Sequence, residues 1–122
     1  MHNIEDIPHI PDQETRLAEI VVDCYGRDEE LSAFEVYFTD ALQPPFAATW
    51  RDLDEPGHDE PVTVLGVASV DDRRGVLMTV QRPGNKERRV LAEQLWADDA
   101  ASVNATVLDD YRSWVEHGGL EP

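Results

Sequence analysis

The sequence predicts an α+β fold in which helices at both ends of the chain flank a small antiparallel sheet. In the N-terminal third and again near the C-terminus, apolar residues recur at spacings of three and four, the period of a helix. Between these segments, short apolar runs alternate with turn sequences rich in Gly, Pro, Asn and Asp, as strands joined by tight turns do. The chain has 122 residues, 41% of them hydrophobic, which suits one domain with its own core.

The start of the chain differs from the rest in composition. Residues 1–11 combine polar groups with two prolines, so we expect a flexible N-terminal arm there. No linker or internal repeat divides the remainder. Residues 12–122 are therefore predicted to form a single α+β domain.

Two helices are expected before the sheet. The first lies within residues 12–25, although the β-branched run 20–22 leaves a strand open, and its apolar face consists of Leu17, Ile20, Val21 and Cys24. The second helix begins after Asp28, whose side chain can cap it. It ends before the Pro44-Pro45 pair, because proline removes a backbone donor and clashes with the preceding turn.

The middle of the chain reads as short strands. Four are predicted from their apolar content and the turns between them, at residues 46–53, 61–70, 75–81 and 88–91. A single helical turn at 93–96 then leads to a last brief pairing. Because short strands joined by tight turns make a small and strongly bent sheet, we expect an SH3-like barrel.

The predicted C-terminal helix occupies residues 98–117. Gly118 and Gly119 end it, and its apolar face consists of Val103, Val107, Tyr111, Trp114 and Val115. The neighbouring acids Asp109 and Asp110 are interpreted as part of its solvated face.

The charge of the chain is strongly negative. Asp and Glu number 26 against 10 Lys and Arg, for a net charge of -16, and Lys86 is the only lysine. Dense carboxylates are what a hard cation such as Ca²⁺ coordinates. A protein adapted to molar salt also tolerates such a charge, because the Debye length falls to about 3 Å at 1 M. Loss of lysine in particular favours salt adaptation, since a cation site gives no reason to remove it.

The composition also argues against several classes of function. A pI near 4.3 argues against nucleic acid and anionic membranes as partners. No apolar run approaches the roughly 20 residues of a membrane span. Nothing resembles a nucleophile elbow or a Gly-rich phosphate loop, and the single Cys24 cannot form an internal disulfide. We therefore expect a soluble, cytoplasmic protein that is not an enzyme.

Two carboxylates of the second predicted helix are candidate ligands. Asp40 lies in the final turn, where a negative side chain opposes the helix dipole, so its position calls for an explanation. Glu35 lies on the same polar flank. A bound cation beside Asp40 would relieve the unfavourable interaction.

The loop 52–60 supplies further candidates. Asp52, Asp54 and Glu60 occupy the first, third and ninth ligand positions of an EF-hand loop. Pro56 stands at the fifth position and Thr63 at the twelfth, where ligands are required. The loop is therefore not an EF-hand; it either offers oxygens to a weakly held ion or is a solvated hairpin loop.

Several segments follow one another in an order that is known from one protein family. They are EIVVDCYG at 19–26, EE at 29–30, YFTDAL at 37–42, PFAA at 45–48, VTVLGV at 62–67, VLAEQL at 90–95 and DYRSWV at 110–115. Through them the chain resembles the CcbP-type calcium-binding proteins over about residues 19–119. The resemblance implies a small acidic α+β protein that sequesters Ca²⁺ through surface carboxylates. It also implies a role for Asp40, which matches a binding aspartate before the Pro-Phe segment.

Two functional hypotheses follow. The first is a calcium-binding protein without an EF-hand that buffers or sequesters Ca²⁺, with calcium ions as its partner and Asp40, Glu35, Asp52, Asp54 and Glu60 as candidate ligands. The alternative is a salt-adapted acidic module that binds an unidentified protein and no specific metal.

Overall fold

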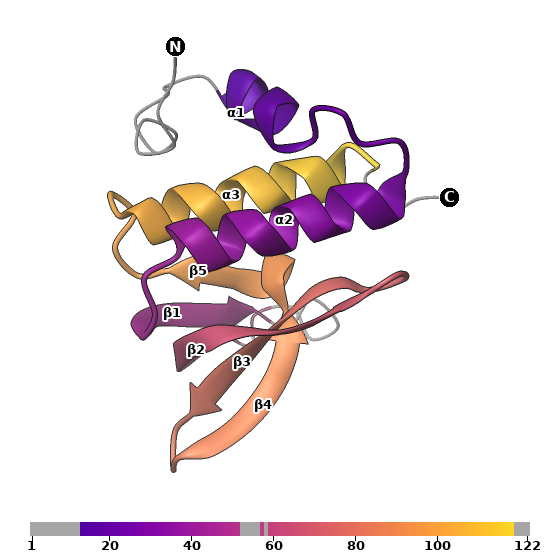
Figure 1. The fold of residues 1–122 in the computed structure, drawn as a ribbon. Coiled ribbons are helices and arrows are strands. Elements are labelled where there is room, and N and C mark those ends of the chain that lie inside the picture. Colours follow the sequence, from indigo (N-terminus) through magenta and orange to yellow (C-terminus); the bar gives the residue numbers. More distant parts are fainter. Residues whose placement is uncertain (1–12, 52–56, 58, 119–122) are drawn as a thin grey trace.

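The computed structural model describes residues 13–51, 57 and 59–118, which form a curved antiparallel sheet under a layer of helices (Figure 1). Helices α2 and α3 lie side by side over the sheet, and α1 lies on their outer side. The elements in chain order are α1 (Gln13–Ile20), α2 (Arg27–Ala41), β1 (Phe46–Arg51), β2 (Asp59–Asp71), β3 (Gly75–Arg82), β4 (Lys86–Leu91), η2 (Ala92–Gln94), β5 (Leu95–Ala97) and α3 (Val103–Glu116). The predicted α+β architecture is confirmed.

The sheet is open, so the expected SH3-like barrel is wrong on this point. The strand order is β4-β3-β2-β1-β5, and every neighbouring pair is antiparallel. No ladder joins the two outer strands within the described part of the chain. The physical reason lies in β5, which has only three residues, all of them paired with β1. Register shifts in β2 near Gly66 and Val67 disrupt its ladder with β3, as β-bulges that bend a strand do.

Element boundaries differ most from the predictions at the first and last helices. The last helix begins at Val103 instead of residue 98. The first ends at Ile20 instead of continuing to residue 25, and Asp23 follows in a left-handed turn with φ of 63°. Cys24 therefore lies outside the helix. The predicted N-terminal arm, residues 1–11, lies outside the described residues. None of the described helices combines the length and apolar character that crossing a membrane requires.

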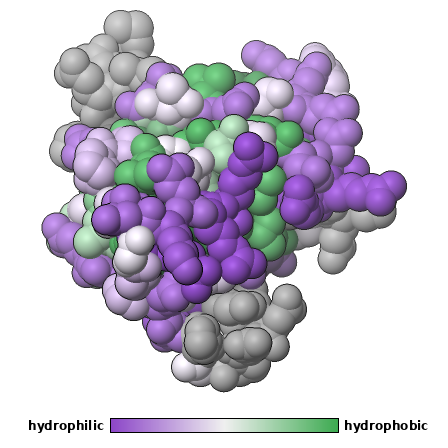
Figure 2. Space-filling model, turned by 90° about the horizontal axis from the view of Figure 1, so that it is seen from below, coloured by the Kyte–Doolittle hydropathy of each residue, from purple (hydrophilic) through white to green (hydrophobic). Residues whose placement is uncertain are grey.

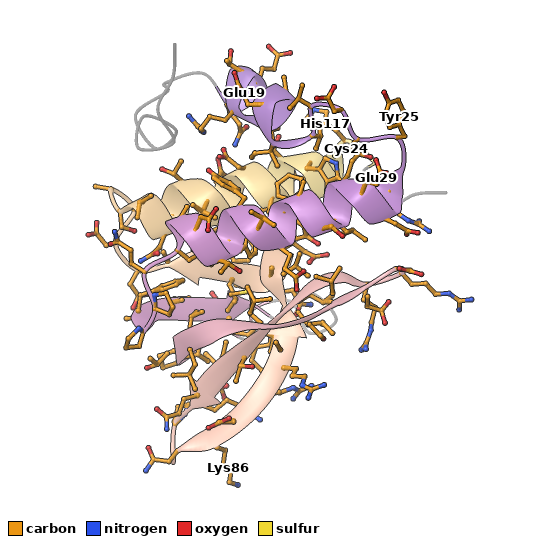
Figure 3. The ribbon with its side chains drawn as sticks, viewed as in Figure 1. Glu19, Cys24, Tyr25, Glu29, Lys86 and His117 are labelled. Atoms are coloured by element: carbon orange, nitrogen blue, oxygen red, sulfur yellow. The ribbon has the colours of Figure 1, made fainter. Side chains whose placement is uncertain are left out.

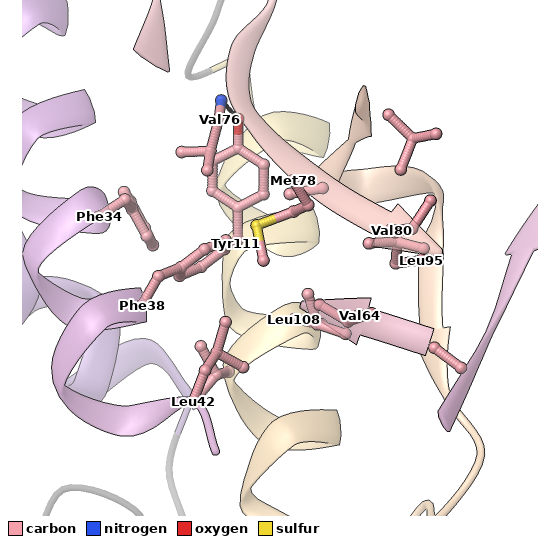
Figure 4. Close-up of a cluster of buried hydrophobic side chains, with 14 of the residues drawn as sticks. Phe34, Phe38, Leu42, Val64, Val76, Met78, Val80, Leu95, Leu108 and Tyr111 are labelled. Carbon is pink, nitrogen blue, oxygen red and sulfur yellow. Dashed lines mark hydrogen bonds between the residues drawn. The ribbon is translucent and has the colours of Figure 1, made fainter. Parts of the chain in front are cut away.

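The core lies between the sheet and the pair α2 and α3 (Figure 4). Tyr111 of α3 is fully buried and makes edge contacts with Phe34 and Phe38 of α2, with ring centroids 5.3 and 5.4 Å apart. Its hydroxyl accepts a hydrogen bond of 2.9 Å from the backbone N–H of Val76 at the start of β3. Aromatic packing of this kind fixes the position of α2 relative to α3 and the sheet.

A buried ion pair holds α1 on this layer. The guanidinium of Arg16 donates to both carboxylate oxygens of Asp110, at 2.8 and 2.9 Å, and the hydroxyl of Tyr37 donates to the same carboxylate at 2.7 Å. The Asp110 side chain is completely buried, so its assignment to a solvated face was wrong. One carboxylate thus joins α1, α2 and α3.

Candidate metal site

Asp40 lies at the exposed C-terminal end of α2. The backbone N–H of Leu42 donates to the carbonyl of Phe38, and the last turn contains no basic residue. The carbonyl ends of this turn and the Asp40 carboxylate therefore add their negative charges without a cation on the same turn. Electrostatically, this end of α2 favours a bound cation.

The C-terminal end of α2 adjoins the start of α3. The backbone N–H of Gln43 donates to Oδ1 of Asn104 at 2.8 Å, and Asn104 is buried in the first turn of α3. Figure 1 shows α2 ending and α3 beginning at the same side of the molecule. The packing of the two helices therefore brings a second chain segment to this end of α2.

That second segment carries two exposed acids. Asp99 accepts from the backbone N–H of Ala101 at 3.0 Å, and Asp98 accepts from the hydroxyl of Thr49 at 3.1 Å. By sequence this pair suits a helix N-cap, but the N-cap of α3 is Ser102, whose side chain accepts from the backbone N–H of Ala105. The location of the two acids at the same end of the helical layer as Asp40 depends on helix packing, and no local sequence signal could have indicated it.

Glu35 and Asp40 do not converge on one point. Both are exposed on α2, but five positions at about 100° each place them about 140° apart around the helix axis. The hydroxyl of Thr39 donates to the backbone carbonyl of Glu35 at 2.9 Å. This contact does not involve the Glu35 carboxylate. A single small ion would not be shared by the two side chains in this arrangement.

Glu60 is already engaged by a basic side chain. Its two carboxylate oxygens accept from Nε and Nη2 of Arg82 at 2.7 and 3.0 Å, and its side chain is only 17% exposed. In the sheet Glu60 lies opposite Trp50, near the end of β1. Asp40 precedes the other end of β1. The structure therefore does not bring Glu60 and Asp40 together.

The remaining candidates, Asp52 and Asp54, lie outside the described residues and stay predictions. The strands on either side of them are in register at Arg51 and Asp59, whose charged groups are 3.7 Å apart.

A preformed metal cage is not found in the described ranges. Among these residues, no three side chains of His, Cys, Asp or Glu form a group that could hold a metal ion. Calcium takes six to eight oxygens and accepts backbone carbonyls and water beside carboxylates. A site at the end of α2 would thus combine few carboxylates with such neutral oxygens.

One Ser–His contact is present at the end of α3, but its geometry does not suit catalysis. Oγ of Ser113 is 3.5 Å from Nδ1 of His117, while the same nitrogen is 2.7 Å from the backbone carbonyl of Ser113. A carbonyl can only accept, so Nδ1 carries a proton. That nitrogen cannot then take a proton from the hydroxyl.

Comparison with known proteins gives one family and two similar structures. The model of the family Calci_bind_CcbP, described as calcium binding, matches residues 15–115. A structure described as a calcium binding protein in the calcium-binding form aligns with a TM-score of 0.76 at 22% identity, covering 92% of this chain and 95% of that one. The crystal structure of Anabaena CcbP aligns with a TM-score of 0.68, also at 22% identity, covering 94% and 93%. At this identity the likeness concerns the fold. No protein with a curated description matches the chain.

Proposed function

Because this chain belongs to the CcbP family of calcium-binding proteins, we propose that it binds Ca²⁺ through surface carboxylates and buffers or sequesters the ion. The observation that carries the proposal is the family match, which extends from α1 to the last turns of α3. The net charge of -16 supports it, since a negative surface raises the local concentration of cations.

Asp40 is the residue that we propose as the principal ligand. It is exposed, and its helix end has no basic residue in the last turn. A calcium ion there would neutralise both the carboxylate and the partial charges of the helix carbonyls. Asp98 and Asp99 are the acids of the adjoining segment, and backbone carbonyls and water would complete the coordination.

The other candidate ligands would not share the ion bound at Asp40. Glu35 would serve a separate, weaker contact, because its side chain points away from that of Asp40. Asp52 and Asp54 remain candidates for a second site in the loop after β1. Glu60 would have to exchange Arg82 for the ion, which costs a charge-assisted bidentate pair.

Affinity is expected to be modest and sensitive to salt. With no cage of three acidic or His side chains in the described residues, the ion must itself draw its ligands together. We expect dissociation constants of about 10⁻⁵ to 10⁻³ M, weaker than those of high-affinity calcium buffers. The bulk of the negative charge we attribute to adaptation to a saline cytoplasm, where a weak site would act as a buffer.

The deciding experiment is calorimetric titration with CaCl₂ at low and at molar NaCl. We compare the wild type with Asp40→Asn and with Asp72→Asn, which removes the same charge at an exposed turn. Asp40→Asn should bind at least one ion about tenfold more weakly, which corresponds to roughly 1.4 kcal/mol. Asp72→Asn should titrate like the wild type.

Two results would contradict these statements separately. Absence of binding by the wild type at low salt would refute calcium binding altogether. Equal titrations of Asp40→Asn and the wild type would leave calcium binding intact and remove Asp40 from the site.

A further inference from the structure

The hairpin of β3 and β4 carries a charge opposite to that of the rest of the chain. Four of the ten basic residues lie between positions 82 and 89, namely Arg82, Lys86, Arg88 and Arg89, and Glu87 is the only acid among them. By contrast, residues 13–42 contain eight acids and two arginines. Figure 3 shows Lys86 at the end of the sheet that is remote from Glu19 and Glu29. Viewed from the side of the hairpin, hydrophilic side chains dominate the surface (Figure 2).

Three of these four cations remain available. Arg82 is paired with Glu60, but none of the described acids forms an ion pair with Lys86, Arg88 or Arg89. All three are exposed. The guanidinium of Arg88 lies 4.8 Å from the ring centroid of Trp50, a cation–π contact that limits its freedom. The strand thus presents unneutralised positive charge on partly ordered side chains.

The backbone of β4 is available on one side as well. All six of its residues pair with β3, and no other strand in the described part of the chain pairs with its outer edge. Side chains alternate along a strand, so Lys86 and Arg88 lie on one face and Arg89 on the other. An extended chain that paired with this edge would form backbone hydrogen bonds with β4. Cationic side chains of β4 would lie on both faces of the enlarged sheet.

Protection against aggregation is an alternative reason for charge on this edge. Charged residues, lysine in particular, commonly prevent unwanted pairing of an edge strand, which would account for Lys86 but does not require the two neighbouring arginines. In a chain with 26 acidic and 10 basic residues, acids would be the expected choice. The only lysine of the chain begins this strand. Pairing of β4 with itself in a second copy would oppose like charges, which is unfavourable.

We propose that the outer edge of β4 binds an extended acidic segment of a partner protein by strand addition. Backbone hydrogen bonds hold the segment, and its carboxylates pair with Lys86, Arg88 and Arg89. The net charge of the molecule does not prevent this, because the Debye length is about 10 Å at 0.1 M salt. The acidic helix α1 lies on the opposite side of the molecule from β4 (Figure 1).

The test uses a synthetic ten-residue peptide in which pairs of Glu alternate with pairs of Thr, so that carboxylates lie on both faces of the extended chain; it is blocked at both ends and labelled with a fluorophore. Binding is measured by anisotropy at 0.1 M salt to the full chain, to Arg88→Glu/Arg89→Glu, and to Arg73→Glu/Arg74→Glu as a matched control at the exposed turn between β2 and β3. The wild type should bind. The β4 variant should bind at least about tenfold more weakly, and the control should stay within about twofold.

Two further reagents keep the test informative. Arg88→Gln/Arg89→Gln removes the charges without reversing them and should weaken binding less than the Glu variant; circular dichroism checks the fold of each variant. An acidic peptide of equal charge with two prolines cannot form a full strand ladder and should bind more weakly than the Glu–Thr peptide.

Several outcomes would overturn the proposal. These are no binding by the wild type, equal weakening by both charge-reversal pairs, or equal affinity for the proline-containing peptide. Preferential binding of a single-stranded oligonucleotide would replace the acidic segment with another partner. Concentration-dependent association in sedimentation that Arg88→Glu/Arg89→Glu abolishes would identify a second copy as the occupant. Calcium titration of that variant should match the wild type, so failure here is separable from failure of calcium binding.

Discussion

At the residue scale, Asp110 is the acidic side chain that joins helices α1, α2 and α3. It is fully buried and accepts from Arg16 and Tyr37, and Gln13 donates to it at 3.1 Å. The hydrogen bond to Asp110 raises the pKa of Arg16, and burial followed by the same carboxylate raises the pKa of Tyr37. Both partners are therefore held in their protonated forms around a negative centre.

Removal of this carboxylate should destabilise the fold severely. Asp110→Ala removes the buried carboxylate to which both Arg16 and Tyr37 donate, and breaking such a pair costs about 3–5 kcal/mol. Asp109→Ala, at the exposed neighbouring position, is the matched control and should change stability by less than about 1 kcal/mol. Urea unfolding measures both variants.

The double variant Arg16→Met/Asp110→Leu distinguishes the cause of the loss. It should lose less free energy of unfolding than Asp110→Ala, because no buried charge is left unpaired. A double variant as unstable as Asp110→Ala would mean that packing, and not the uncompensated charge, explains the effect.

At the element scale, the turn η2 carries a partly buried acid between two edge strands. Glu93 lies here, where the chain passes from β4 to β5, and its Oε1 is buried with no hydrogen-bond partner. Burial raises the pKa of this carboxyl above its ordinary value of 4.5, although Arg112 acts in the opposite direction. The native state therefore binds the proton of this carboxyl more tightly than the unfolded chain does.

This preference predicts a pH-dependent effect of Glu93→Gln. The stability that native Glu93 contributes is fully present below its unfolded pKa and is lost as the pH rises through the raised native value. The variant should thus gain stability relative to the wild type as the pH increases from about 4 to 7. Glu87→Gln, which removes the same charge on exposed β4, is the matched control. Urea titrations at several pH values test this, and a pH-independent difference would contradict it.

At the scale of the whole molecule, charge is distributed unevenly. The helical layer is acidic, the β3–β4 hairpin is basic, and the total is -16. Self-repulsion of this size destabilises the compact state, and salt screens it. Any added salt should therefore raise the melting temperature.

Calcium should stabilise the protein beyond this general effect. At a free concentration of 100 times the dissociation constant, a ligand specific for the native state adds about 2.7 kcal/mol. Melting curves in CaCl₂ and in NaCl of equal ionic strength separate specific binding from screening, with MgCl₂ as a second comparison. Identical curves in CaCl₂ and NaCl would favour the interaction module without a specific metal site.

Much of the secondary structure could be predicted from local sequence. Helical spacing of apolar residues indicated α2 and α3, and the Pro44-Pro45 pair marked the end of α2. Turn sequences located β2 and β3. The predicted end of α1 was wrong. The helix ends at Ile20 because the chain then turns toward α2, and tertiary contacts decide where it turns.

Only part of the candidate site could be predicted from the sequence. Asp40 was predicted as a ligand from its position in a helix and from a family resemblance, both of which are local in sequence. The adjoining segment with Asp98 and Asp99 was not, since its approach to α2 depends on packing between residues 61 positions apart, Gln43 and Asn104.

The sequence by itself determined the class of fold, the order of elements, the acidic surface and the family resemblance, because periodicity, composition and short motifs are properties of neighbouring residues. Only the tertiary structure decided that the sheet stays open, that Asp110 is buried, and that Glu60 is paired with Arg82. It also placed the basic hairpin away from the acidic helices, at a sheet edge that no other described strand pairs with. Strand register and helix packing join residues that lie far apart in the chain. Whether a charged side chain is buried, paired or exposed depends on those contacts.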